Sequence, residues 1–281
     1  MLGFAPYKHS PPYPVLIMFK FIPQATLLLL SVSTALAASP RMSSLKVSQP
    51  EAAVMRACTQ DELCVEILPG CEGEACASGE ADGKVFSLTG GQRNPVYSRY
   101  HLAELLSPNE DTSLQLWPKL IRFGDGILAG AETKLRSMYS GGGASSTTLH
   151  LIAFLPDQAP FVVLSVPQSA SVMIRACFSE QNMKQRAGAC HDLYDFNASL
   201  ALTGAYAADM PVLRYRSKAT SFPGPVSRSK DSLSGRPLRQ RDILTVTDPQ
   251  CSYQRLYRFD PATRAYIANK PAPDCSDYTT P

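Results

Sequence analysis

The sequence predicts a mainly β fold, built either as an antiparallel β-sandwich or from blade-like β repeats, with a small Cys-rich helical segment near the N-terminus. Short apolar runs rich in β-branched residues are separated by turns rich in Gly and Pro, and this pattern extends from about residue 118 to the C-terminus. The chain has 281 residues, of which 44% are hydrophobic, so it is long and apolar enough to bury a core. These values exclude a disordered or collagen-like protein.

The first 37 residues are expected to form a secretory signal peptide. A basic region precedes an apolar stretch over residues 22–35, and an Ala-Leu-Ala cleavage site ends at Ala37. We expect the true start at Met18, because residues 1–17 lie upstream of this basic region. The alternative is a membrane anchor, but the apolar stretch is shorter than the ~20 residues of a spanning helix. We therefore expect an exported protein, periplasmic or extracellular, with no transmembrane anchor after cleavage.

Residues 38–82 are predicted to form a leader followed by an acidic segment. Residues 38–50 have the composition of a flexible leader, whereas residues 51–82 contain eight acidic residues against Arg56 alone. Removal of the signal peptide lowers the formal net charge of the chain from +3 to +1. This near-neutral balance gives no whole-protein argument for nucleic-acid binding.

Two short helices are expected in the N-terminal third. Apolar residues at helical spacing predict one helix within residues 51–68, ended by Pro69 and Gly70. The second helix is expected over residues 99–107, ended by Pro108.

Residues 83–281 are predicted to form the mainly β domain. Its first unit is a strand, a Gly-Asp-Gly turn and a second strand. The expected strands are 120–123, 127–129, 147–155, 161–166, 172–178, 200–202, 212–215, 253–259 and 265–267, and residues 260–264 form a hairpin loop.

A weak repeat runs through this domain. Pro118, Pro160 and Pro211 each stand at the start of an apolar run, and they are 42 and 51 residues apart. Repeats of about 40–50 residues with several strands each are typical of propeller blades. A regular antiparallel sandwich is the alternative.

Two runs of this domain carry a resemblance. The first extends from Phe123-Gly124-Asp125-Gly126 through Ser140-Gly141-Gly142-Gly143 to Leu149-His150-Leu151. The second extends from Cys251-Ser252-Tyr253 through Tyr266 to Asp274-Cys275-Ser276-Asp277-Tyr278. Both runs are similar to the β-hairpin repeats of uncharacterised exported bacterial proteins. The resemblance implies architecture and export, and it transfers no catalytic or metal-binding residue.

The cysteines indicate disulfide bonds in an oxidising compartment. An even number of cysteines without a C-x2-C pair favours disulfides over a zinc site or a redox motif. Proximity in the sequence suggests the pairs Cys177–Cys190 and Cys251–Cys275, while the first four cysteines allow three pairings among themselves. Mixed pairing between the first four and the later four cysteines is a further alternative. The cysteines are Cys58, Cys64, Cys71, Cys76, Cys177, Cys190, Cys251 and Cys275.

The segment 214–241 is the strongest local charge anomaly. It contains eight basic residues against Asp231, and its Pro and Gly residues predict a loop over much of its length. It is either a solvated surface loop or a contact site, for the acidic segment of the same chain or for an anionic partner such as an envelope component or polymer. Few aromatic residues interleave it, so nucleic acid is not indicated. The candidate contact residues are Arg214, Arg216, Lys218, Arg228, Lys230, Arg236, Arg239 and Arg241.

No motif assigns a reaction to the chain. The sequence contains no nucleophile elbow, zinc-protease motif, P-loop or dinucleotide-binding motif. We therefore assign no catalytic, metal-binding or cofactor-binding residue, and expect a non-catalytic binding or envelope-interaction protein. The alternatives are an envelope hydrolase that uses His101, His150 or His191, and an inhibitor of a secreted enzyme.

Overall fold

A computed structural model describes residues 39–47, 54–69, 84–90, 98–102 and 112–281. The chain divides into two units, Met1–Leu36 and Ala37–Pro281, and the predicted signal peptide lies outside the described residues. The second unit is mainly β, and its sheets are antiparallel.

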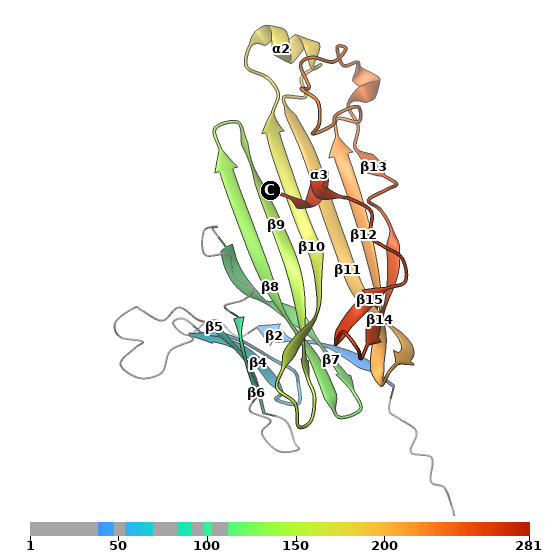
Figure 1. Cartoon of the computed structure of the whole chain (residues 1–281). Coiled ribbons are helices and arrows are strands. Elements are labelled where there is room, and N and C mark those ends of the chain that lie inside the picture. Colours follow the sequence, from blue (N-terminus) through green and yellow to red (C-terminus); the bar gives the residue numbers. More distant parts are fainter. Residues whose placement is uncertain (1–38, 48–53, 70–83, 91–97, 103–111) are drawn as a thin grey trace, which may run out of the picture. The chain divides into compact units, whose positions relative to one another are not determined.

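The larger sheet is a meander, in which strands that follow one another in the sequence lie side by side (Figure 1). β1 pairs with the outer edge of β7, and β13 pairs with part of β12. Its strands are β1 (Arg41–Ser44), β7 (Thr112–Phe123), β8 (Gly126–Tyr139), β9 (Gly142–Phe154), β10 (Phe161–Arg175), β11 (His191–Ala207), β12 (Met210–Phe222), β13 (Val246–Asp248), β14 (Gln254–Asp260) and β15 (Ala265–Ala268).

A smaller sheet packs against one face of this meander. Its strands are β2 (Lys46–Val47), β3 (Met55–Cys58), β4 (Cys64–Pro69), β5 (Lys84–Thr89) and β6 (Ser98–His101), paired in that order. Apolar side chains of both sheets form one buried cluster, in which Phe86 of β5 lies with its ring centroid 5.9 Å from that of Phe154 of β9. Burial of each large apolar side chain contributes about 1.5–3 kcal/mol, so this cluster stabilises the contact between the sheets.

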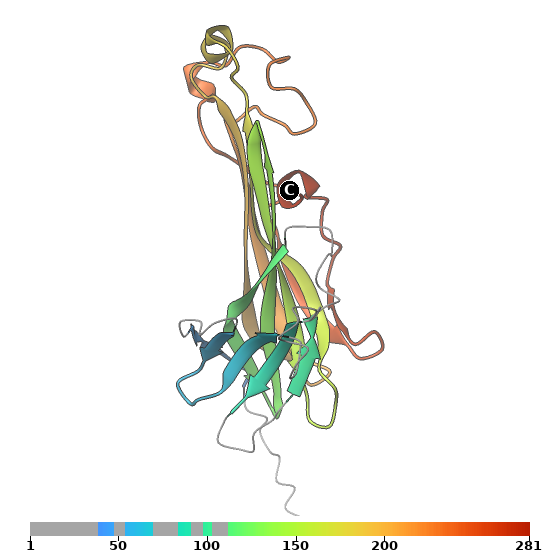
Figure 2. The same ribbon diagram turned by 90° about the vertical axis from the view of Figure 1, so that its left-hand side faces the viewer.

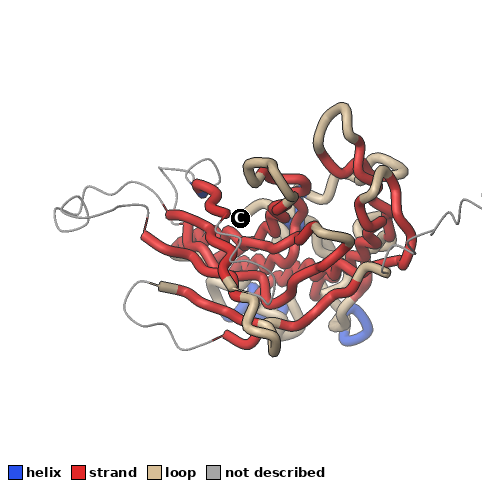
Figure 3. The backbone as a smooth tube through the Cα atoms, turned by 90° about the horizontal axis from the view of Figure 1, so that it is seen from below, coloured by secondary structure: helices blue, strands red, loops and turns tan. Residues whose placement is uncertain are grey.

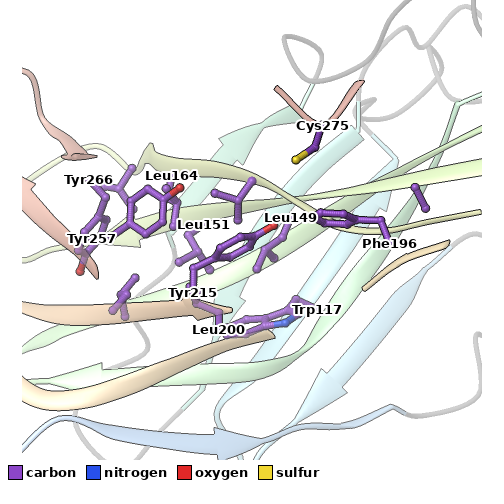
Figure 4. Close-up of a cluster of buried hydrophobic side chains, with 14 of the residues drawn as sticks. Trp117, Leu149, Leu151, Leu164, Phe196, Leu200, Tyr215, Tyr257, Tyr266 and Cys275 are labelled. Carbon is purple, nitrogen blue, oxygen red and sulfur yellow. The ribbon is translucent and has the colours of Figure 1, made fainter. Parts of the chain in front are cut away.

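The main core forms because the larger sheet opens between two of its strands. β10 pairs with β11 only over Ser169–Arg175, although β10 pairs with β9 along almost its whole length. Outside this short stretch β10 and β11 are not paired with each other. Trp117 and Leu149 of one half of the meander join Tyr215 and Tyr257 of the other half in one buried cluster (Figure 4).

Short helical elements lie outside the sheets. They are α2 (Glu180–Gln185), the 3-10 helix η2 (Gln240–Asp242) and α3 (Ser276–Thr279). The C-terminal segment with α3 runs beside the large sheet (Figure 2), where the ring of Tyr278 meets that of Tyr194 edge to face. In the described part of the chain, no helix is both long and apolar enough to cross a membrane.

The predicted N-terminal helical segment is wrong. Its described part forms the hairpin of β3 and β4, closed by the disulfide between the directly opposed Cys58 and Cys64. Ala57 and Val65 are buried in the cluster between the sheets, so tertiary burial overrides the helical spacing. The second expected helix begins as strand β6, and its residues from 103 onward lie outside the described part.

Two further details differ from the sequence-based expectations. The described part of the expected flexible leader forms β1 and β2, because its backbone pairs with strand edges and Leu45 enters the cluster between the sheets. The two strands expected over 161–166 and 172–178 are the single strand β10. Strands β4 and β5, which stand before and after residue 82 in the sequence, are neighbours in one sheet.

Candidate functional site

The basic segment 214–241 divides into two parts. Arg214, Arg216 and Lys218 lie on strand β12, while the other five candidate residues lie in the loop between β12 and β13. We call residues 223–245 the basic loop. The two parts have different surroundings, so each is described separately.

On β12 the three cations share one side of the strand. Successive side chains of a strand point to opposite faces, and here Arg214, Arg216 and Lys218 are exposed while Tyr215 and Ser217 between them are buried. The buried side contributes to the main core. The exposed side therefore carries all three charges, of which Arg216 also donates to Gln254 Oε1 at 3.0 Å.

Strand register extends this basic surface across the sheet. Lys218 belongs to a cross-strand row with Asn197, Ser169, Thr147 and Lys134, which spans four strand spacings. At ~4.8 Å for each spacing, the row is about 19 Å wide. Side chains in one row point to the same face, so Lys134 and Lys218 stand at the two sides of a hydroxyl-rich strip.

The adjacent row has the same character. It contains Arg136, Ser145, Ser171, Asp195 and Thr220, of which Arg136 and Ser171 are exposed. We call the surface formed by Lys134, Arg136, Arg214, Arg216 and Lys218 the open face.

Two acids lie beside the cations of the open face. They are Asp195, in the second row, and Glu132, two residues before Lys134 on β8. Burial raises the pKa of the Glu132 carboxyl. Five cations against two carboxylates leave the open face positive.

In the basic loop, two cations are already engaged. Arg228 donates to the backbone carbonyls of Asp277 and Thr280 at 3.0 and 2.7 Å. Arg236 forms a bidentate pair with Asp242 at 2.7 and 3.0 Å, which holds the pKa of that carboxyl well below its usual range. These cations tie the loop to the C-terminal segment and to itself.

A buried ion pair anchors the basic loop to the end of the sheet. The Arg186 guanidinium, after α2, contacts the Asp192 carboxylate at the start of β11, and the other oxygen of that carboxylate accepts from the Ser232 hydroxyl of the loop. Arg186 is 1% and Asp192 3% exposed. Gln185 adds two bonds to the loop, one from its side chain to the Leu233 carbonyl and one from the Leu238 amide to its own carbonyl.

The acidic segment 51–82 has basic partners of its own in its described part. Asp61 pairs with Arg122 at 2.8 Å, and Glu66 pairs with Arg56 at 3.2 Å. A hydrogen bond from Thr59 and the contact with Arg122 lower the pKa of Asp61. Both acids are thus satisfied by residues outside the basic segment.

Of the three candidate histidines, His150 is a buried residue of β9 that lies between two hydroxyls. Its Nε2 lies 2.9 Å from Thr133 Oγ1, and its Nδ1 lies 2.9 Å from Ser165 Oγ. Burial lowers the pKa of His150, so the neutral ring is favoured.

His101 and His191 are exposed. His191 and Asp192 are consecutive in a strand and so point to opposite faces, and Asp192 is occupied by Arg186. Glu104, the acid near His101 in the sequence, lies outside the described residues.

The cysteines serve as cross-links. Disulfides join Cys58 to Cys64, Cys177 to Cys190, and Cys251 to Cys275, and the last two are the pairs expected from the sequence. Cys71 and Cys76 lie outside the described residues. These bonds indicate an oxidising compartment. The described residues contain no cluster of His, Cys, Asp and Glu suited to a metal ion.

A pocket that the sequence reasoning missed lies where four hairpins end. The turns β7–β8, β9–β10, β11–β12 and β14–β15 lie at the same end of the larger sheet (Figures 1 and 3). Residues of all four turns line the pocket, and its volume is about 680 Å³. The sequence shows each turn separately, but it does not show that the four turns surround one cavity.

Comparison of the chain with protein-family models, with curated proteins and with solved structures gave no match.

Proposed function

We propose that this is an exported, non-catalytic binding protein that holds an anionic envelope polymer on the open face of its larger sheet. One observation carries the proposal: Arg214, Arg216 and Lys218 alternate with core residues along β12, so their charges stand together on one exposed surface. The disulfides and the predicted signal peptide support export.

The neighbouring rows suit a flexible polyanion. Hydroxyls of Thr147, Ser169 and Ser171 lie between the cations at either side, and hydroxyls donate hydrogen bonds to anionic oxygens. Attraction between exposed charges is screened over about 8 Å at physiological salt. Binding should therefore be strong in dilute buffer and weak at high salt.

The experiment measures binding of inorganic polyphosphate to the full chain by fluorescence anisotropy. We expect the triple variant Arg214→Gln, Arg216→Gln, Lys218→Gln to lose binding by roughly tenfold or more, because three adjacent charges are removed. Its circular dichroism and thermal unfolding should stay unchanged, since the three side chains are exposed.

A matched control removes three charges elsewhere. Lys230→Gln, Arg239→Gln and Arg241→Gln change exposed residues of the basic loop and lower the net charge by the same amount. Retained binding by this control supports the open face. Equal losses in both variants would show that only net charge matters, and binding of phosphatidylglycerol vesicles without polyphosphate would point to a membrane surface instead.

A second candidate function is hydrolysis, favoured by the contact between exposed Ser165 and the buried His150 ring at 2.9 Å. A serine nucleophile needs such a base, but the other ring nitrogen faces Thr133 instead of a carboxylate that would orient it. A fluorophosphonate probe that labels the wild type but not Ser165→Ala would support hydrolysis. Absence of labelling would retire it.

A further inference from the structure

The pocket at the hairpin ends, which we call the tip pocket, has apolar walls. Phe123, Leu155 and Phe161 line it from the β7–β10 half of the sheet, and Met210 and Phe259 line it from the other half. Ligand pockets typically enclose about 300–1,000 Å³ and are mainly apolar. A cavity of roughly 150 Å³ already holds benzene, so about 680 Å³ has room for several apolar side chains.

One cation stands in this wall. The guanidinium carbon of Arg264 lies 3.9 Å from the centroid of the Phe161 ring, and Nη2 donates to Gln158 Oε1 at a long 3.4 Å. Stacking on a ring leaves the N–H groups at the edge of the guanidinium available, and that edge matches a carboxylate in a bidentate geometry. Among the described residues, no carboxylate pairs with Arg264.

Two carboxylates also line the tip pocket, in addition to the Arg264 cation. Asp125 in the β7–β8 turn and Asp209 in the β11–β12 turn line the same pocket and are exposed. A purely anionic amphiphile would be repelled by these two acids, and an organic cation would be repelled by Arg264. The wall is complementary to an apolar molecule that carries one negative and one positive group.

We propose that the tip pocket binds a short apolar peptide with free termini. Arg264 holds its carboxylate, Asp125 or Asp209 holds its ammonium group, and the phenylalanines enclose its side chains. This site is separate from the open face, and it does not depend on the function proposed for that face.

The turns that carry these charges have defined backbone conformations. Asp209 and Arg264 have φ values of 62° and 55°, in the left-handed region that non-glycine residues adopt rarely. Such residues persist only where the surrounding hairpin determines them. The backbone positions of Asp209 and Arg264 are therefore set by tight turns instead of long loops.

The experiment titrates the tripeptide Leu-Phe-Leu into the full chain by isothermal calorimetry. C-terminal amidation should weaken binding by roughly tenfold, the effect of losing one charge-assisted bond. In Arg264→Gln, the free and amidated peptides should bind with equal affinity, because the partner of the carboxylate is absent. N-acetylation should give the same pattern with the double variant Asp125→Asn, Asp209→Asn.

Arg258→Gln is the matched control, because Arg258 is an exposed arginine of β14 outside the pocket. It should bind both peptides as the wild type does. The proposal is overturned if the tripeptide does not bind, or if amidation has the same effect in Arg264→Gln as in the wild type. It is also overturned if decanoate or free phenylalanine binds as tightly as the tripeptide.

Discussion

The buried pair of Arg186 and Asp192 allows a sharp test of how the basic loop is held. Replacement of Asp192 by Ala leaves the Arg186 guanidinium, 1% exposed, with one hydrogen-bond acceptor among the described residues, the Ala189 carbonyl at 3.1 Å. It also removes the acceptor of the Ser232 hydroxyl. Breaking a buried ion pair from one side costs about 3–5 kcal/mol, because the remaining charge stays desolvated.

The expected loss in the free energy of unfolding is therefore about 4 kcal/mol. With a denaturant slope of about 2–3 kcal/mol per molar urea, the midpoint should fall by more than ~1 M. The double variant Arg186→Met, Asp192→Leu should recover at least ~2 kcal/mol of this loss, since apolar replacements remove both charges together.

Urea unfolding followed by circular dichroism measures these differences under non-reducing conditions. Limited trypsin digestion adds a local readout, because release of Ser232 should speed cleavage at the neighbouring Lys230. A loss below about 1 kcal/mol for Asp192→Ala, or a double variant no more stable than the single one, would refute the buried-pair reasoning.

Three further predictions concern single features. Burial depresses the pKa of His150, so the unfolded chain takes up a proton at a higher pH than the folded chain, and the free energy of unfolding should fall as the pH drops below about 6.5. The difference between the urea midpoints at pH 7 and pH 5 should therefore be smaller in His150→Gln than in the wild type. An equally reduced difference in His191→Gln would contradict this reasoning. Replacement of Cys251 and Cys275 by Ser should cost about 3 kcal/mol in calorimetric unfolding, and unchanged stability would count against the bridge. Gly90→Ala should lower the melting temperature, because its Cβ would lie 2.3 Å from a backbone carbonyl oxygen; an unaltered melting temperature would argue against that close approach.

The local signals of the sequence account for much of the β region. Gly and Pro turns with apolar runs between them placed the β7–β8 hairpin and the β14–β15 hairpin, since tight turns and strand propensity act over a few residues. The helix expected within residues 51–68 was wrong for the opposite reason. Its spacing was helical, but burial of Ala57 and Val65 between two sheets decided for strands.

For the candidate sites, the sequence identified charged residues but not where they lie relative to one another. It singled out the cations of segment 214–241 as one group, whereas the structure places three of them on the open face and five in the basic loop. Lys134 and Arg136, which complete the open face, are far away in the chain and gave no signal, because they join Lys218 only through strand register.

The sequence by itself determined the mainly β class, the two later disulfide pairs and the concentration of positive charge, because each depends on composition or on residues close in the chain. Only the tertiary structure decided which residues share a face, which charges are neutralised and where a pocket opens. β10 and β11 pair over only a short stretch, and four turns that are distant in the sequence line the tip pocket. Which turns meet depends on contacts between residues far apart in the chain, and no short window of the sequence contains those contacts.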